Sequence, residues 1–283
     1  SSVVTIDMSA PTLISVSIAS DNAIDRSLAK AGDTITVTIT ASEAIGTPSV
    51  MIAGQGASVQ GSGTGWTATY VVNGSAVTDG AATVTVAYSD TAGNVGVSQT
   101  AVTVGELVTL DLTAPTLSVV AIASDNGNTA LALIGDVITV SVTASEDITT
   151  PTVALTNLGG ASCSGTSPGT SFACTYTVQS GDTEGAVAFT VDFSDTAGNA
   201  GTQGVSVTSG SDVVVNLTAP TLTVVAIASN NSDTELAVIG DVITLSVNAS
   251  EDITTPTVSF TGLSGAGGAA AASCAGTSPG TTF

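Results

Sequence analysis

The sequence predicts an all-β protein in which sandwich domains repeat in tandem, and three observations support this class. Motifs of the 283-residue chain recur at intervals of 103 to 105 positions, apolar and polar residues alternate along short stretches, and Gly, Asn and Asp separate these stretches. An alternation with a period of two is typical of strands that are buried on one face. Because the interval exceeds the roughly 20 to 50 residues of most solenoid units, a whole domain is repeated.

Five motifs define the repeats and follow one another in the same order. They predict that residues 10–110 form a first repeat, 111–215 a second and 216–283 an incomplete third, while residues 1–9 are the closing strand or linker of a preceding repeat. The motifs are Ala-Pro-Thr-Leu from Ala10, Ala114 and Ala219; Gly-Asp from Gly32, Gly135 and Gly240; Ala-Ser-Glu from Ala41, Ala144 and Ala249; Thr-Pro from Thr47, Thr150 and Thr255; and Ser-Asp-Thr-Ala-Gly-Asn from Ser89 and Ser194.

Both ends of the sequence fall inside a repeat. Residues 2–11 match residues 212–220, and Phe283 aligns with Phe172, so the third repeat has no counterpart of the last strands of the second. The preferred interpretation is that the sequence is a window on a longer array. The alternative is that a neighbouring chain donates the missing strands to the open sheet.

The strands within a repeat follow from the alternation. Apolar side chains occupy every second position of residues 35–39 and 84–88 in the first repeat and of residues 138–144 and 187–193 in the second, and no helical pattern of comparable length competes. Roughly seven such strands in about 105 residues fit the two-sheet sandwich of an immunoglobulin-like domain. We expect short linkers to join these sandwiches into a rod. A larger single barrel is the weaker alternative, because a barrel would not repeat its linker.

The balance of charge excludes several kinds of partner. The chain has 23 acidic and two basic residues, and its net charge is −21. Arg26 and Lys30 cannot neutralise so many carboxylates, and a surface of this sign repels nucleic acid and anionic lipid. Hydrophobic residues make up 43% of the chain, which is sufficient for packed cores, and no apolar stretch approaches the length of a membrane span.

The chain contains no histidine, and this removes much catalytic chemistry. A Ser-His-Asp or Cys-His nucleophile cannot be built, and the commonest general base near neutral pH is missing. Paired carboxylates could still hydrolyse glycosides, but sugar subsites usually carry aromatic platforms, and aromatic residues make up only 3% of this chain. We therefore expect that the protein is not an enzyme.

The motifs resemble those of a known family. Asp-Leu-Thr-Ala-Pro from Asp111, Gly-Asp from Gly135, Ser-Glu-Asp from Ser145 and Asp-Thr-Ala-Gly-Asn from Asp195 are similar to the bacterial immunoglobulin-like tandem repeats of large cell-surface adhesins and surface-layer proteins. The resemblance covers essentially the whole chain and implies an immunoglobulin-like fold at an extracellular, cell-surface location. It does not specify a target, because the same module builds stalks, lattices and binding tips.

The three cysteines predict one complete disulfide. Cys163 and Cys174 flank a turn rich in Gly, Ser and Pro, and Val59 and Ala68 occupy the aligned positions of the first repeat. An apolar pair replaced by a cysteine pair indicates facing side chains, hence a disulfide formed in an oxidising compartment. Two buried free thiols are the alternative. Cys274 aligns with Cys163, and we interpret it as half of a disulfide whose partner lies beyond residue 283.

Several acidic motifs are predicted to meet at one pole of each sandwich. In an immunoglobulin-like topology the linker, the turn after the second long strand and the last hairpin lie at the same upper pole. In the second repeat these elements carry Asp111, the pair Glu146 and Asp147, and Asp195. Clustered carboxylates repel one another unless a cation binds, and Ca²⁺ takes about six to eight oxygen ligands without needing histidine. The sequence therefore predicts Ca²⁺ at this joint.

Equivalent acids define the other predicted calcium sites, and we expect the middle site to be the strongest. Ala44 replaces the second acid of the pair in the first repeat, and Asn216 replaces the linker aspartate in the third. The alternative is that Asp, Asn and Gly occur here only because they make turns, with Gly198 at positive φ. The further predicted ligands are Asp7, Glu43 and Asp90 in the first repeat, Glu251 and Asp252 in the third, and Asp21. Together with Asp25, Asp33 and Asp79, Asp21 is expected to face the second joint from below.

Two functional classes are left. The first is an extracellular structural protein, a calcium-stiffened repeat array that serves as adhesin stalk, filament or surface-layer subunit and associates with copies of the same chain or with neighbouring repeats. The second is an adhesion module whose loops bind a carbohydrate or a host protein at a cell surface. Near-identical loops in successive repeats favour the first class, because the loops of a binding tip would diverge from those of its neighbours.

Overall fold

The computed structural model describes residues 4–260 and 272–283, and every regular element in these ranges is a β-strand. The all-β class predicted from the alternation is therefore confirmed, and the arrangement in several sheets is consistent with sandwiches. The chain forms two compact units, Ser1–Asn216 and Leu217–Phe283, which are described separately. Because the first unit includes both the first and the second repeat, the boundary between these repeats stays a prediction.

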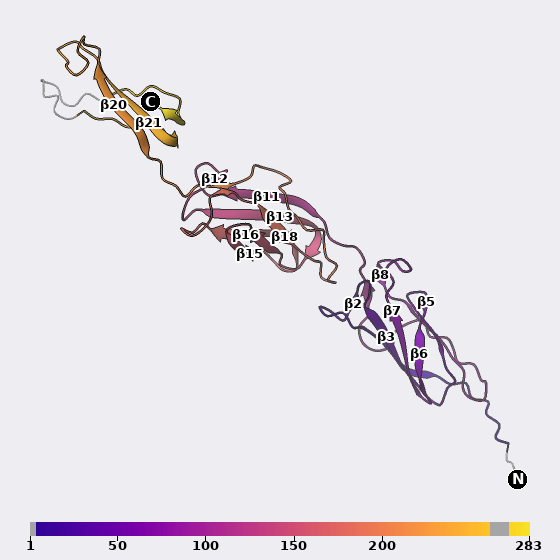
Figure 1. The fold of residues 1–283 in the computed structure, drawn as a ribbon. Helices are drawn as coiled ribbons and strands as arrows, with labels where there is room; N and C mark the ends of the chain where they lie inside the picture. The colour runs from indigo at the N-terminus through magenta and orange to yellow at the C-terminus, as the bar shows by residue number, and fades with distance from the viewer. Residues whose placement is uncertain (1–3, 261–271) are drawn as a thin grey trace. The chain divides into compact units, whose positions relative to one another are not determined.

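Residues 13–110 of the first repeat form ten strands in three sheets (Figure 1). The strands are β1 (Leu13–Ser20), β2 (Leu28–Ala29), β3 (Thr34–Ala41), β4 (Ser49–Ile52), β5 (Gln55–Gly56), β6 (Ser58–Ser62), β7 (Gly65–Val71), β8 (Gly80–Ala81), β9 (Val84–Ala87) and β10 (Thr109–Leu110). The largest sheet has the order β1-β3-β7-β6, and the two smaller sheets have the orders β2-β10-β8 and β5-β4-β9. Neighbouring strands are antiparallel except β2 and β10, which run parallel.

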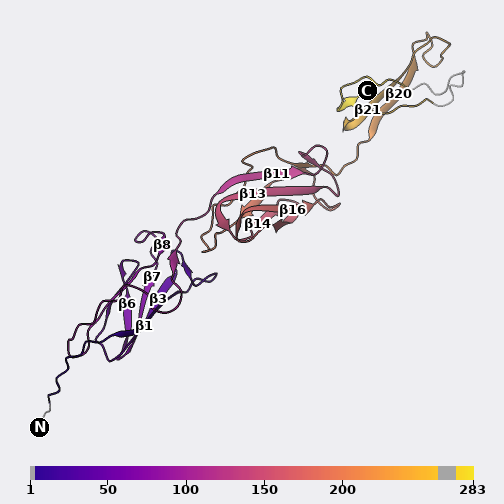
Figure 2. The same ribbon diagram turned by 180° about the vertical axis from the view of Figure 1, so that it is seen from behind.

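The second repeat follows a similar plan in residues 117–215. Its strands are β11 (Leu117–Ser124), β12 (Leu131–Ala132), β13 (Val137–Ile148), β14 (Thr152–Leu155), β15 (Gly159–Ser164), β16 (Gly169–Thr177), β17 (Gly185–Ala186), β18 (Phe189–Asp192) and β19 (Val214–Val215). They form one sheet of order β11-β13-β16-β15-β14-β18 and one of order β12-β19-β17. The long strands β11, β13 and β16 lie side by side in both views (Figure 1 and Figure 2).

The core of each repeat is built by the alternation that the sequence displays. In β3 the inward residues Ile35, Val37 and Ile39 are all 0% exposed, whereas the threonines between them are half-buried or exposed. Val140 and Val142 repeat this pattern in β13. Burying one such side chain contributes roughly 1.5 to 3 kcal/mol. The strands are therefore held in register, because a slip by one residue would move the whole apolar row to the solvent face.

A short closing strand fixes the start of each linker. β10 lies between β2 and β8, and β19 lies between β12 and β17. Val108 and Leu110 at the first closing strand are 1% and 3% exposed, and Val213 and Val215 at the second are 0% and 1% exposed. Since Asp111 directly follows Leu110, the burial of this strand anchors the linker where the acidic motif begins.

The second unit exposes an apolar face in its described residues. β20 (Leu222–Ser229), β21 (Ile243–Ile253) and β22 (Gly280–Thr282) pair in that order, and β20 and β21 lie side by side (Figure 2). Val225 and Ile227 are 57% and 63% exposed, whereas their counterparts Val120 and Ile122 in β11 are 2% and 3% exposed. In the second repeat Thr208 donates its backbone N–H to the Val120 carbonyl at 2.8 Å, and the 283-residue sequence holds no counterpart of this threonine.

The acidic pair predicted to form a turn lies inside a strand, which corrects the prediction. Glu146 and Asp147 belong to β13, and the equivalent pair of the third repeat belongs to β21. The apolar alternation resumes at Ile148, which is fully buried and extends the strand past the polar residues. Glu146 takes a position of the inward row and is half-buried, while Asp147 is exposed. The register of β13 against β16 is irregular between Thr143 and Ile148.

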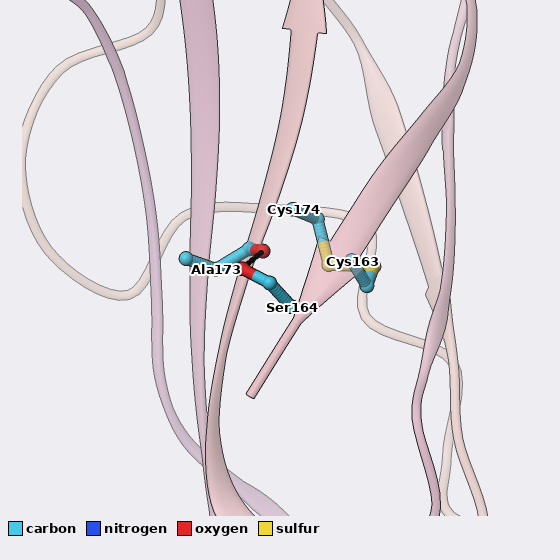
Figure 3. Close-up of a disulfide and its surroundings, with 4 residues drawn as sticks. All are labelled: Cys163, Ser164, Ala173 and Cys174. Atoms are coloured by element: carbon cyan, nitrogen blue, oxygen red, sulfur yellow. Dashed lines mark hydrogen bonds between the residues drawn. A yellow bond between two sulfur atoms is a disulfide. The ribbon is translucent and has the colours of Figure 1, made fainter. Parts of the chain in front are cut away.

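The predicted disulfide is present. Cys163 and Cys174 are directly opposite one another in the antiparallel pair of β15 and β16, and their sulfur atoms are bonded (Figure 3). Beside them the Ser164 hydroxyl donates a hydrogen bond to the Ala173 carbonyl at 3.2 Å. The equivalent pair of the first repeat, Val59 and Ala68, is also directly opposite in β6 and β7. The interpretation of Cys163 and Cys174 as buried free thiols is therefore wrong.

Candidate metal centre

Two groups of three carboxylates lie at equivalent places in the first and second repeats. Within each group one oxygen of every residue lies within 4.8 Å of the others. We call them the first triad, Asp7, Glu43 and Asp90, and the second triad, Asp111, Glu146 and Asp195. Each triad combines one acid from a linker, one from the end of the second long strand or just beyond it, and one from the loop of the repeated hexapeptide. That these acids bind a metal stays a prediction.

Hydrogen bonds from the second repeat hold the linker at its pole. The Asn199 side-chain amide donates to the Asp111 backbone carbonyl at 3.0 Å. The Thr116 backbone N–H donates to the Ser145 hydroxyl at 3.0 Å, next to Glu146 in the chain. These bonds place the linker aspartate against both the loop and the strand that supply the other two acids.

The first repeat also contacts this linker, through Asp79. The Asp79 carboxylate accepts hydrogen bonds from the Leu112 backbone N–H and the Thr113 hydroxyl, each at 2.6 Å. The side-chain bond from Thr113, followed by the backbone bond from Leu112, lowers the pKa of Asp79. Of the four acids expected to face the joint from below, Asp79 is therefore the one that binds the linker directly in the structure.

The hexapeptide loop presents the third acid of the triad. Asp195 is 1% exposed, and its carboxylate accepts the Asn199 backbone N–H and the Asn199 side-chain amide, both at 2.8 Å. Gly198 has a φ of +88°, a conformation that side chains rarely adopt. The predicted turn-making role of these residues is thus confirmed. The turn also fixes the Asp195 carboxylate where it meets Asp111 and Glu146.

Burial and mutual repulsion perturb the second triad. The pKa of Asp111 is raised, first by burial and then by the charges of Asp195 and Asp79, while a hydrogen bond from the Thr113 backbone opposes this. The pKa of Glu146 is raised by burial and then by Asp111, Asp195 and Asp79. Both carboxyls therefore lie in an environment that disfavours their charged forms. A bound cation would reverse this preference.

The first triad has the same layout in a more open setting. Asp7 is exposed, whereas its counterpart Asp111 is half-buried. The Asn94 side-chain amide donates to Asp90 at 2.7 Å and to the Asp7 carbonyl at 3.3 Å. Its bond to Asp90 is the largest cause of the lowered pKa of that carboxyl, which burial opposes. The expectation that the middle site is the strongest stays a prediction. It agrees with the greater burial of Asp111 compared with Asp7.

Four of the predicted ligands lie outside both triads. Asp147 is exposed on the opposite side of β13 from Glu146, and the Asp21 carboxylate accepts the Thr34 backbone N–H at 2.6 Å. Among the residues that the structure describes, neither triad includes Glu251 or Asp252 of the third repeat. The counterpart of Asp195 would fall beyond residue 283, so the given sequence does not contain all three parts of a third site.

Two further predicted residues have local partners. Asp25 accepts the Ser27 backbone N–H at 2.8 Å and its hydroxyl at 2.7 Å, and these bonds lower the pKa of Asp25. Cys274 has a free thiol, which donates to the Pro256 carbonyl at 3.1 Å. Its pairing with a cysteine beyond the given sequence stays a prediction.

The sequence interpretation missed two kinds of supporting residue. The serine of Ala-Ser-Glu accepts a backbone N–H from the linker in every repeat, and the hexapeptide asparagine donates to the linker carbonyl in the first two. The signal for both was available, because these residues recur at fixed positions. They are Ser42, Ser145 and Ser250, and Asn94 and Asn199.

The donor set suits a hard divalent cation. All ligand atoms that the triads offer are carboxylate oxygens, with backbone carbonyls of the linker nearby. Ca²⁺ accepts irregular shells of about six to eight oxygens, whereas Mg²⁺ demands near-octahedral geometry and retains several waters. Three carboxylates supply part of a calcium shell, so water or carbonyl oxygens would complete it. The triads therefore fit calcium in charge and in donor type.

Comparisons with known proteins leave the family open. No family model matches the chain, and no curated protein matches it. Among solved structures, SGBP-B of the Bacteroides ovatus mixed-linkage glucan utilization locus, in complex with a mixed-linkage heptasaccharide, is 13% identical with a TM-score of 0.20, and the match covers 75% of this chain and 50% of that one. A likeness this low supports no inference about function. Within the described residues, no helix has the length and apolarity needed to cross a membrane.

Proposed function

We propose that the chain is an extracellular structural protein: an array of immunoglobulin-like repeats, stiffened by calcium, that serves as an adhesin stalk, a filament or a surface-layer subunit. The observation that carries the proposal is the recurrence of one carboxylate triad at the same place in two successive repeats. Structural arrays need the same joint many times, whereas a ligand-binding tip needs one distinct surface.

Calcium is proposed because the second triad is costly without a cation. Asp111 and Glu146 have raised pKa values, caused first by burial and then by neighbouring carboxylates. With 23 acidic and two basic residues, the chain cannot neutralise its carboxylates with its own bases. A divalent ion with oxygen ligands would compensate this charge locally and would favour the folded joint.

The stiffening follows from which elements the ligands belong to. Asp111 belongs to the linker, Glu146 to β13 and Asp195 to the hexapeptide loop. An ion held by all three would restrict the linker relative to the second repeat. Asp79 connects the same linker to the first repeat through hydrogen bonds to Leu112 and Thr113. Calcium at the triad would thereby limit bending between the two repeats.

An extracellular location is supported by the disulfide. Disulfides form and persist mainly in oxidising compartments, and the bond between Cys163 and Cys174 closes a hairpin that the first repeat builds without cysteine. The strands also carry many Thr and Ser residues and very few Lys. Such faces suit side-by-side packing with copies of the same chain, which we propose as the partners of a lattice or filament.

Thermal unfolding with and without calcium tests the proposal. We expect a higher melting temperature in millimolar CaCl₂ than in excess EDTA, since a ligand at about 100 times its Kd stabilises the folded state by about 2.7 kcal/mol. NaCl at matched ionic strength is the control for screening of the surface charge. An unchanged melting temperature in excess EDTA would contradict calcium binding.

A further inference from the structure

The first two repeats contact each other through a second set of residues that needs no metal. Asn22, at the lower pole of the first repeat, is 4% exposed. Its side-chain amide donates to the Asp33 carboxylate at 2.7 Å and to the Ala197 backbone carbonyl at 2.8 Å. Ala197 belongs to the hexapeptide loop of the second repeat, 175 positions further along the chain. One side chain therefore connects the two repeats directly.

The Asn22 side chain is held in one orientation. Its carbonyl oxygen accepts the backbone N–H of Ile24 at 2.9 Å and of Asp25 at 3.1 Å. Both hydrogens of its amide are used, one by Asp33 and one by Ala197. An amide fixed at both ends and shielded from water offers a directed hydrogen bond, and leaving the buried carbonyl without this donor carries a desolvation penalty.

The surface that Asn22 contacts is shaped by small residues. Ala197 is 0% exposed, whereas Ala92, in the identical hexapeptide of the first repeat, is exposed. A Cβ added at Gly198 would lie 3.1 Å from the Ile24 side chain, whereas one added at Gly93 would meet nothing within 4 Å. The two loops have the same sequence and similar φ at their glycines, +88° and +99°. The difference in burial therefore comes from the neighbouring repeat.

We propose that the Ala197–Gly198 turn is a docking surface for the lower pole of the preceding repeat, and that Asn22 is the positioning residue that sets the orientation of the two repeats. The inference rests on the proposed repeat array but not on its calcium sites. The hexapeptide loop then has two roles in the second repeat. Asp195 belongs to the second triad, and the Ala197 carbonyl accepts the hydrogen bond from Asn22 of the first repeat.

Asn126 provides a matched control for Asn22. In the second repeat its side-chain amide donates to Asp136 at 2.7 Å, its carbonyl oxygen accepts the Asn128 backbone N–H at 3.0 Å, and its backbone N–H donates to the Ser124 hydroxyl at 3.1 Å. Asn22 makes the equivalent bonds within its own repeat. Of these two asparagines, only Asn22 also bonds to the other repeat of the described first unit. Comparing Asn22→Ala with Asn126→Ala therefore isolates the contact between the repeats.

Residual dipolar couplings of the isotope-labelled full chain, measured in excess EDTA so that no cation restrains the linker, test the proposal. We expect one common alignment tensor for residues 10–110 and 111–215 in the unsubstituted chain and in Asn126→Ala. In Asn22→Ala we expect two different tensors, with the smaller magnitude reporting motion of one repeat against the other. Equal behaviour of Asn22→Ala and Asn126→Ala would overturn the role of Asn22.

A second pair of variants tests the proposal even if Asn22→Ala disturbs the conformation of its own loop. Ala197→Leu enlarges the contacted turn, and Ala92→Leu makes the same change in the exposed turn. We expect the common tensor to be lost only in Ala197→Leu, and retention in both variants would contradict a docking surface. The same couplings in excess CaCl₂ separate the two proposals: recovery of the common tensor by Asn22→Ala on adding calcium supports calcium stiffening, and no recovery argues against it. The comparison of the variants in EDTA does not depend on calcium.

Discussion

Glu146 belongs both to a core strand of the second repeat and to the proposed metal site. It occupies the inward row of β13, between Ala144 and the fully buried Ile148, and its pKa is raised first by this burial. An apolar residue at this position would extend the core by one side chain. The repeat instead places a carboxylate there, next to two others, and this environment disfavours the charged form of Glu146.

Glu146→Gln should therefore have effects of opposite sign with and without calcium. In EDTA we expect a small increase in melting temperature, because the substitution removes one of three mutually repelling charges while keeping the size of the side chain. In CaCl₂ we expect a lower melting temperature than that of the unsubstituted chain, because one ligand is weakened. Differential scanning calorimetry in both conditions measures the two signs.

Two further substitutions control this experiment. Glu43→Gln changes the equivalent acid of the first triad and should behave in the same way at the other site. Glu106→Gln changes an exposed acid outside both triads and should move the melting temperature little in either condition. A Glu146→Gln variant that destabilises equally in EDTA and in calcium would indicate a packing role without a metal.

The raised pKa values also predict how the calcium effect depends on pH. For Asp111 and Glu146 the folded pKa lies above the unfolded value, so without metal their contribution to stability is fully present below the unfolded pKa and is lost as pH rises through the folded pKa. Calcium requires the deprotonated forms. We therefore expect the difference in melting temperature between CaCl₂ and EDTA to be largest near pH 7 and to shrink as the pH falls toward about 4.

The comparison at each pH cancels the carboxyls that lie outside the triads. Asp79 and Asp90 have lowered pKa values caused first by side-chain hydrogen bonds from Thr113 and Asn94, so their contribution is lost as pH falls through the folded pKa. For Asp79, outside the triads, this loss occurs in EDTA and in CaCl₂ alike. A calcium effect that grows on acidification would contradict ligation by Asp111 and Glu146.

At the scale of the elements, the sequence predicted the strands correctly where apolar and polar residues alternate without interruption. Strict alternation predicted β3 and β13, because a half-buried strand has no other pattern, and the aligned pair Val59 and Ala68 predicted that Cys163 and Cys174 face each other. It was insufficient where polar residues interrupt the alternation. The Ser-Glu-Asp segment was predicted as a turn, yet burial of Ile148 extends β13 through it.

The candidate site was predictable to a similar extent. The recurring motifs identified the three acids of each triad, because a shared pole follows from the order of the strands. Asp79 was expected to face the joint, but its bonds to the linker and the contact made by Asn22 could not be found in this way, since they depend on contacts between repeats. A pattern that recurs within each repeat carries no information on which residues of one repeat touch the next.

The disulfide allows a prediction at the element scale. Replacing Cys163 and Cys174 with the residues of the first repeat, Cys163→Val with Cys174→Ala, should keep the hairpin of β15 and β16 but lower the stability of the second repeat by about 3 kcal/mol, the chain-entropy cost of releasing a loop of this length. Denaturant unfolding measures the loss against the oxidised unsubstituted chain, and the reduced unsubstituted chain is the control that lacks the disulfide without a substitution.

The outcome separates two origins of stability. If the substituted and the oxidised chains unfold at the same denaturant concentration, the hairpin is stabilised by packing and the disulfide adds nothing. If the substituted chain fails to fold, hydrogen exchange of the oxidised and reduced chains gives the same comparison without a substitution, because both chains have one sequence.

At the scale of the whole molecule, the acids behind the net charge of −21 are concentrated in a few recurring segments. The strands that build the cores carry mainly Val, Ile, Thr and Ser, while acids recur in the linkers, the hexapeptide loops and the strand ends that meet at the poles. Carboxylates of the described residues therefore cluster at the linkers. The proposed calcium-stiffened array would require such a distribution, and a surface of this sign repels nucleic acid and anionic lipid.

Calcium titration by isothermal calorimetry tests the central claim most directly. The account predicts saturable binding at both described triads of the unsubstituted chain, loss of one site in Glu146→Gln, loss of the other in Glu43→Gln, and loss of both in the double variant. Glu106→Gln should bind like the unsubstituted chain. Binding that is absent from the unsubstituted chain, or that is unchanged in the double variant, would contradict the claim that these triads are calcium sites.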